Sequence, residues 1–237
     1  MRAGRFNGTK INAPRAQRGV VLLITLIILV AMTLAGIGMM RSVDTGSIIA
    51  GNLAFRQAAA NAGDAGPAAG FNALMSVANS GNGADKNVLD FNTGQPCPSG
   101  VTAALCSGGN INIAGYASTP IFACEVTRTC TAAANYTWWT VDANWSNAAI
   151  LPPITDPNGG GTIATVSYLI HRMCQSPGVR PSAAGQLCQT YTQPETGCSK
   201  TQLLPCTSTS VFYRITTRSQ GSRDTVAYAQ TLVLIAE

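Results

Sequence analysis

One stretch of the chain, residues 20–40, limits its possible folds more than any other feature. It holds 21 residues without a charged side chain, and five Leu, four Ile and three Val are among them. As an α-helix rising about 1.5 Å per residue it would be roughly 32 Å long, which matches the hydrocarbon core of a bilayer. The sequence therefore predicts a transmembrane helix over residues 20–40.

Charged residues before this stretch predict its orientation. Because basic residues stay on the cytoplasmic side, we expect a cytoplasmic N-terminus and export of the rest of the chain. The basic residues in question, with no acidic residue among them, are Arg2, Arg5, Lys10, Arg15 and Arg18. Their five positive charges account for the whole formal net charge of +5, so the rest of the chain is nearly neutral. Near-neutrality argues against a nucleic-acid-binding surface, and we expect neither a nucleic-acid partner nor a small-molecule substrate.

Three interpretations of the N-terminal region are open. A signal peptide should end in a small-residue cleavage site, but the nearest candidate, at residues 33–35, lies inside the apolar stretch. A lipoprotein would need a cysteine directly after that stretch, and the first cysteine is Cys97. The third interpretation rests on Arg18, Gly19 and Val20, which place a basic residue and a glycine directly before the apolar stretch. This arrangement resembles a type IV prepilin leader, which implies cleavage between Gly19 and Val20 and a retained helix.

The residues after the apolar stretch extend this resemblance. Residues 40–42 read Met-Arg-Ser, and residues 50–52 read Ala-Gly-Asn, followed by Arg56 and an Ala-rich run. The pattern resembles the N-terminal region of PilX-type minor pilins of type IV pili over roughly residues 17–65. It departs from that family where the run usually reads Gln-Ala-Ala-Glu-Ala, and Gly66-Pro67 follows soon after. We therefore expect the helix to end or kink earlier than in the family.

The expected fold class is α+β and type IV pilin-like. A long N-terminal transmembrane and amphipathic helix precedes a roughly four-stranded antiparallel sheet with disulfide-stapled loops. The expected parts are a leader (1–19), a transmembrane helix (20–40), an amphipathic continuation (41–66) and a globular periplasmic or extracellular head (67–237). Within the head we expect a short helix at 71–78 and a long loop region at 80–118. Alternating or β-branched residues and flanking turn signals predict strands at 121–126, 162–172, 211–218 and 225–235.

All eight cysteines follow the apolar stretch, and an even number in an exported domain predicts disulfides. A zinc site is the weaker alternative, because no Cys-x-x-Cys pair occurs and His171 is the only histidine. We expect no metal and no cofactor. Our expected pairing joins sequence neighbours: Cys97–Cys106, Cys124–Cys130, Cys174–Cys188 and Cys198–Cys206.

Residues that could carry catalysis are few, and we expect that the protein is not an enzyme. A Ser-His-Asp site would need His171, which falls in a predicted strand, where a half-buried, hydrogen-bonded imidazole is the favoured interpretation. Asp85, Asp90 and Asp156 flank turns without matching a calcium-binding loop, so we expect them to be solvated.

One aromatic segment is a candidate interface. It contains Tyr136, Trp138, Trp139 and Trp145, and these include all three tryptophans of the chain. Such residues anchor protein–protein interfaces. The alternative, which we favour, is that they cover the sheet as part of the core.

Two classes of function remain. The first is a minor pilin that primes type IV pilus assembly, lies at or near the pilus tip and supports adhesion or twitching motility; a minor pseudopilin of type II secretion is its close variant. The second is a non-polymerising protein, anchored in the inner membrane, whose head binds a periplasmic target. The pilin resemblance implies a bacterial inner-membrane location before assembly and then the pilus. It also implies a prepilin peptidase, other minor pilins, the major pilin and a tip adhesin as partners.

The fifth residue of the predicted mature chain bears on the position in such a filament. Counted from Val20 it is Ile24, whereas major pilins that resemble this chain at the leader carry Glu there. That Glu is thought to pair with the N-terminal amine of the subunit assembled before it. An isoleucine instead is what we expect of a first or tip-most subunit.

Overall fold

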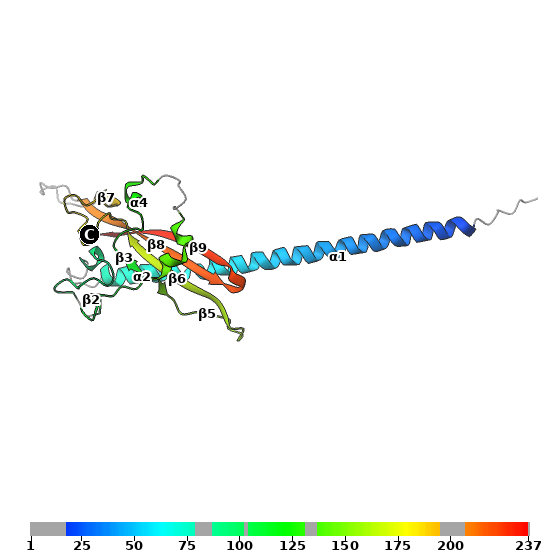
Figure 1. The fold of residues 1–237 in the computed structure, drawn as a ribbon, viewed down its shortest axis with the longest axis horizontal. Helices are drawn as coiled ribbons and strands as arrows, with labels where there is room; N and C mark the ends of the chain where they lie inside the picture. Colours follow the sequence, from blue (N-terminus) through cyan, green and yellow to red (C-terminus); the bar gives the residue numbers. More distant parts are fainter. Residues whose placement is uncertain (1–17, 79–86, 102–103, 131–136, 195–206, 237) are drawn as a thin grey trace, which may run out of the picture. The chain divides into compact units, whose positions relative to one another are not determined.

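The computed structural model describes residues 18–78, 87–101, 104–130, 137–194 and 207–236. The chain divides into two compact units, residues 1–52 and residues 53–237, which we call the helical unit and the head unit. Helix α1 (Arg18–Gly63) runs through both, and helix α2 (Ala65–Ala78) belongs to the head unit. Figure 1 shows α1 in blue and α2 in cyan.

The described part of the helical unit, residues 18–52, is a single helix, and from Gly19 to Asn52 every residue except Gly51 is exposed. The helix is long and apolar enough to cross a membrane, as the sequence predicts. Two hydroxyl side chains within residues 20–40 bond to the helix itself. Thr25 donates to the carbonyl of Leu22 and Thr33 to that of Val30, each at 2.9 Å. The hydroxyls are therefore satisfied without water, which suits an apolar environment.

We expected the helix to end or kink around Gly66 and Pro67, and α1 does end close by, at Gly63. Its interruption is a single turn residue, Asp64, after which α2 continues to Ala78. Pro67 is the third residue of α2, in the first turn, where a missing N–H breaks no helical hydrogen bond.

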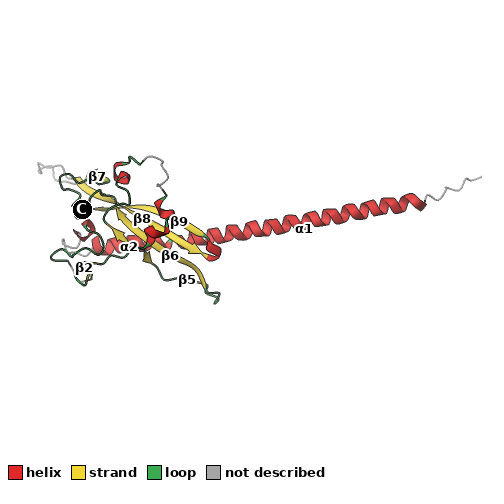
Figure 2. Ribbon diagram, viewed as in Figure 1, coloured by secondary structure: helices red, strands yellow, loops and turns green. Residues whose placement is uncertain are grey.

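The head unit contains one mixed sheet of seven strands rather than the four antiparallel strands expected. Strands β8 and β9 pair along their whole common length, and β6 and β7 pair with successive parts of the other edge of β8 (Figure 2). The short strands β3, β4 and β5 pair with β6, and only β3 does so in parallel. The bounds are β3 Tyr116–Ala117, β4 Ala149–Ile150, β5 Ile154–Thr155, β6 Thr162–Arg172, β7 Thr190–Pro194, β8 Thr207–Gly221 and β9 Val226–Ala236.

The remaining elements are short. Strands β1 (Cys106–Ser107) and β2 (Asn110–Ile111) form a separate two-stranded sheet. Helix α4 is Cys124–Thr127, and the 3-10 helices are η1 Asn87–Asp90, η2 Trp138–Thr140, η3 Asp142–Trp145 and η4 Ser222–Asp224.

The strand predictions at 162–172, 211–218 and 225–235 are confirmed by β6, β8 and β9, whereas the prediction at 121–126 is wrong. That segment contains α4 instead. A fully extended chain would separate Cys124 from Cys130 by roughly 20 Å. Their disulfide holds the two Cα atoms 5.0 Å apart, so the chain must turn there. The strands that the sequence missed are mostly two residues long, too short to show alternation.

Small residues let the helix lie directly on β8. Ala59, Gly63, Gly66 and Gly70 form one face of α1 and α2, and β8 offers alternate residues to that face. A Cβ atom added at Gly66 would lie 2.3 Å from Cγ2 of Thr217, and one added at Gly70 would lie 2.8 Å from Cγ2 of Ile215. Further along α2, Leu74 and Val77 enter the main core. Its other large members include Val88, Ile111, Tyr168, Ile170, Val211, Tyr213, Ile215 and Ile235.

We predict that Gly66→Ala destabilises the head unit, because the new methyl group has no room against Thr217. The expected loss is about 1–3 kcal/mol, the usual cost of an overpacked core. The matched control is Gly63→Ala on the same helix face, where the added Cβ would lie at an ordinary 3.5 Å from Ser219. Thermal unfolding in detergent measures both, and an equal effect of the two substitutions would contradict the close contact.

Candidate functional site

The N-terminal turns of α1 hold the residues of the predicted leader cleavage. The helix begins at Arg18, so Gly19 and Val20 lie in its first turn, and Ile24 lies one turn later. Val20 is 54% exposed and Ile24 is 49% exposed. A side chain at Gly19 would meet nothing within 4 Å. The side chains of Val20 and Ile24 at this helix end are therefore exposed and apolar.

The apolar surface surrounds the helix rather than following one side of it. Large apolar side chains are exposed at 15 of the 21 positions of residues 20–40, on all sides of the helix. A helix that is apolar all round is stable only when surrounded by lipid or by other apolar helices. Exposed apolar residues also occur beyond residue 40, at Val43, Ile48, Ile49 and Leu53.

In the head unit a fully buried arginine joins several loops to the sheet. Arg172, at the end of β6, forms an ion pair with Asp90. Its other hydrogen bonds go to backbone carbonyls: Nε donates to Ser118 at 3.2 Å, and Nη2 donates to Ser176 at 3.3 Å and to Val179 at 3.0 Å. Because a buried guanidinium must find partners for all its donors, these contacts fix the loops that supply them.

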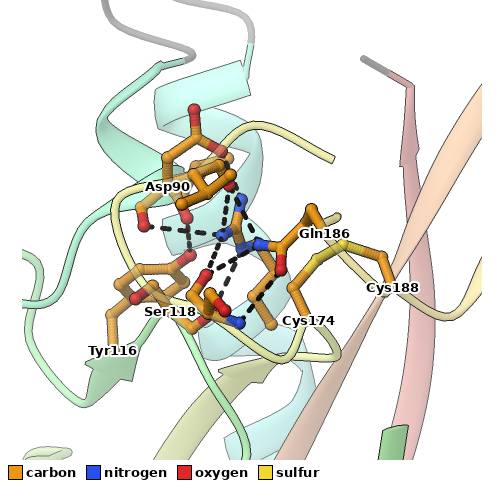
Figure 3. Close-up of a disulfide and its surroundings, with 10 residues drawn as sticks. Asp90, Tyr116, Ser118, Cys174, Gln186 and Cys188 are labelled. Atoms are coloured by element: carbon orange, nitrogen blue, oxygen red, sulfur yellow. Dashed lines mark hydrogen bonds and ion pairs between the residues drawn. A yellow bond between two sulfur atoms is a disulfide. The ribbon is translucent and has the colours of Figure 1, made fainter. Parts of the chain in front are cut away.

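Neighbouring polar groups complete this arginine cluster. Figure 3 shows Asp90, Tyr116, Ser118 and Gln186 gathered beside the Cys174–Cys188 disulfide. The Gln186 amide donates to the carbonyl of Ser176 at 2.7 Å and accepts from its N–H at 3.0 Å. The Tyr116 hydroxyl donates to the Leu89 carbonyl. Burial raises the pKa of Tyr116 well above its usual value, so this hydroxyl keeps its proton and acts as a donor.

Asp90 is not the solvated turn residue that the sequence suggested. It is 7% exposed, and burial raises the pKa of its carboxyl group although Arg172 pulls that pKa down. Asp156 does belong to a turn, where its Oδ1 accepts from the N–H of Asn158 at 2.8 Å. Asp85 lies outside the described residues.

A second buried ion pair lies on the opposite face of the sheet. Arg214 of β8 binds both carboxylate oxygens of Glu125, at 2.7 and 3.1 Å. The Glu125 carbonyl accepts from the Gln189 side chain at 2.7 Å. The Cys124–Cys130 disulfide closes the short loop that presents Glu125. This pair therefore holds the α4 segment against the sheet.

The tryptophan segment packs against the same face as Arg214. Trp138 and Trp145 are buried against Leu169, Trp139 is half-buried, and Tyr136 lies outside the described residues. Arg214 lies 5.1 Å from the ring centroid of Trp138. The indole N–H of Trp145 donates to the Trp139 carbonyl at 2.8 Å. Trp138 and Trp145 thus serve as core, the alternative that we favoured over an interface.

His171 lies under this aromatic cover and is more buried than expected. It is 3% exposed, and its ring is 5.1 Å from that of Trp138. Its Nδ1 has no hydrogen-bond partner among the described residues. Burial lowers the pKa of His171 to about 3, and the positive charge of Arg214 adds to this lowering. A neutral imidazole of this kind is a poor proton acceptor near neutral pH.

His171 also lines an open cleft of about 720 Å³ next to β3. The side chains around it offer amides and hydroxyls, among them Asn92, Asn112, Asn147 and Thr119, and none of its lining residues carries a full charge. The cleft could accept water or neutral polar groups. Within the part of the chain that the structure describes, no three His, Cys, Asp or Glu side chains gather as metal ligands would.

Three disulfides are present in the described residues: Cys97–Cys106, Cys124–Cys130 and Cys174–Cys188. They are the sequence-neighbour pairs that we expected. The expected pair Cys198–Cys206 lies outside the described residues.

The residues that sequence reasoning missed are the two buried arginines. A signal for one of them was available, because alternation along β6 places Arg172 on the same face as the apolar Tyr168 and Ile170. An arginine on a core-facing position requires a buried counter-charge. Its partner Asp90 is 82 positions away and could not be identified from the sequence.

We predict that His171 makes the head unit sensitive to acid. The pKa of His171 in the folded protein, about 3, is below the usual 6.5. The neutral imidazole therefore contributes fully to the free energy of unfolding above about pH 6.5, and this contribution is lost as the pH falls toward 3. Between about pH 7.5 and pH 4, the free energy of unfolding of the native protein should fall by roughly 3 kcal/mol more than that of His171→Gln.

Urea unfolding of both proteins across this pH range measures the difference. NMR of the single imidazole provides the control, because its signals should not titrate near the ordinary histidine pKa. A titration near pH 6.5 in the folded protein would show that the imidazole is solvated.

Comparison of the chain with family models, with curated proteins and with solved structures finds no match. The fold class, the apolar helix and the disulfides are therefore the observations from which a function can be proposed.

Proposed function

We propose that the protein is a minor pilin that primes assembly of a type IV pilus and lies at or near its tip. The observation that carries this proposal is the long N-terminal helix, which is uncharged and apolar on all sides over residues 20–40. Helix α2, which follows α1 after one residue, packs closely on the sheet of a disulfide-bonded head. This α+β layout is compatible with that of a pilin.

Such a helix suits a subunit that leaves the membrane for a filament. Its apolar side chains can exchange lipid for neighbouring apolar helices without exposure to water, because lipid tails are as apolar as those helices. Gly36, Gly38 and Gly46 are exposed on the helix, and a side chain added at any of them would meet nothing in the isolated chain. They provide places where neighbouring helices can approach closely.

Ile24 supports the initiating position. A carboxylate within a membrane is costly unless it is paired, and a few kcal/mol per charge is the usual scale. A subunit with Glu at this position gains by docking behind another subunit's free amine. Ile24 carries neither that cost nor that attraction, while the amine of Val20 can still pair with the Glu of the next subunit. This asymmetry fits a subunit that others follow.

A non-polymerising anchored protein is the alternative, and leader processing distinguishes the two. We predict a mature N-terminus at Val20, because prepilin-type cleavage would act at the cytoplasmic end of the helix. Intact-mass analysis of protein from membranes tests this. Gly19→Leu should leave the chain uncleaved but still anchored, and Gly36→Leu is the control that should be processed normally. A chain that retains Met1 would contradict the prepilin assignment.

The tip position makes a separate prediction. Deletion of the protein should sharply reduce pilus number, and labelled copies should occur at filament ends only. Ile24→Glu should move some label into the shaft, because the new carboxylate lets the subunit follow another one. Ile27→Glu is the matched control, since it adds a comparable membrane insertion cost of about 3 kcal/mol one turn away from the docking position. Label along the shafts of the native protein would contradict the tip assignment.

A further inference from the structure

The last strand of the chain forms a long edge of the sheet. Strand β9 (red in Figure 1) pairs with β8 from Val226 through Ala236. No described strand pairs with its other edge. Its 11 residues are about twice the usual length of a strand.

The unpaired backbone groups of this edge can be assigned to particular residues. In an antiparallel pair, successive residues direct their N–H and C=O groups alternately toward the partner strand and away from it. The N–H of Gly221 donates to the carbonyl of Thr225 at 2.8 Å, so odd-numbered residues of β9 face β8. The even-numbered residues therefore direct their backbone groups outward: Val226, Tyr228, Gln230, Leu232 and Leu234.

The side chains of these same residues share one face of the sheet. Four of them are apolar or aromatic and exposed: Val226 at 40%, Tyr228 at 37%, Leu232 at 57% and Leu234 at 42%. On the other face, Ile235 belongs to the main core and Val233 packs against it. The outward edge thus combines a row of hydrogen-bonding groups with a flanking apolar strip.

The sequence and register features that normally protect an edge strand are absent from β9. Natural edges are blocked by charged residues, proline, bulges or very short strands. Residues 226–236 contain no charged residue, no proline and no glycine, and the register with β8 runs without a shift. The outer edge of β6 differs, because the two-residue strands β4 and β5 lie there with a register shift at Ile154/Thr155.

We propose that β9 accepts an extended segment of a partner subunit as an additional antiparallel strand. The alternating N–H and C=O groups can be satisfied by a polypeptide in β conformation, which adds at the strand spacing. Because the edge carries no charge, the complementary segment is uncharged, with apolar side chains at alternate positions that cover Leu232 and Leu234. The inference rests on the proposed function, since it places this partner in the same assembly.

Site-specific photo-crosslinking of the full chain in cells tests the proposal. A benzoylphenylalanine at Gln230 should cross-link to another protein, and the cross-linked peptide, identified by mass spectrometry, should come from an uncharged, alternately apolar segment. The same probe at Ile150, which is 77% exposed at the opposite edge of the sheet, is the control and should not capture that segment.

Two variants distinguish strand pairing at the edge from nonspecific apolar contact. Leu232→Lys with Leu234→Lys adds charge beside the edge, whereas Leu232→Pro removes one outward N–H without removing a bond to β8. Each should lower the cross-link yield at least about tenfold, while Ile150→Lys should leave it unchanged. Intact disulfides and an unchanged unfolding temperature in detergent identify the variants that still fold. A lowered cross-link yield in one folded variant is enough to support strand pairing.

Three outcomes would overturn the proposal: no cross-link from Gln230, a cross-link to β9 of a second copy, or a yield that both folded variants leave unchanged. These failures are distinguishable from failure of the proposed function. If the chain is processed at Val20 and piliation depends on it, but no cross-link forms, only the edge-pairing proposal is refuted. A cross-link with the expected variant effects in a chain that retains Met1 would instead remove the pilin assignment.

Discussion

The close contact between the helix and β8 is the constraint on which the rest of the head unit depends. Gly66 and Gly70 bring the helix so near the strand that an added methyl group would overlap Thr217 or Ile215. The hydroxyl group of Thr217 is buried in this contact without a hydrogen-bond partner among the described residues, which ordinarily costs 1–3 kcal/mol. The close approach brings Leu74 and Val77 into the core, and their burial outweighs a cost of this size.

Loops with few apolar residues are held to this sheet by charge and by covalent bonds. Arg172 and Arg214 lie on opposite faces of the sheet, and each binds a buried carboxylate that belongs to a loop or short helix. A disulfide lies close to each pair: Cys174–Cys188 near Arg172 and Cys124–Cys130 around Glu125. Buried ion pairs add little net stability over apolar packing, but loss of one partner is strongly destabilising. Their main effect is therefore to specify where these loops lie.

The sequence revealed the parts of the fold that repeat a pattern and missed those fixed by single distant contacts. The apolar run at 20–40 and the alternation at 162–172 predicted α1 and β6, because many residues contribute to each signal. The segment 121–126 looked like a strand, yet the disulfide at Cys124 and the ion pair of Glu125 turn it into a helix. Two-residue strands such as β4 leave no pattern, since their hydrogen bonds to β6 and not their own side chains define them. Of the candidate site residues, the structure brings Trp138 and Trp145 together with His171, but it leaves leader cleavage and the role of Ile24 as proposals.

Two exposed surfaces of this chain call for partners of different kinds. Over residues 20–40, the apolar surface of α1 has no free directional side chains, because both threonines in this stretch donate to carbonyls of the helix itself. Lipid and neighbouring helices can therefore replace one another around it with little change in free energy. The edge of β9 is directional, because its outward N–H and C=O groups alternate along the strand and only a segment in register satisfies them. A subunit with both surfaces could exchange its surroundings along the helix while the sheet edge keeps one specific partner.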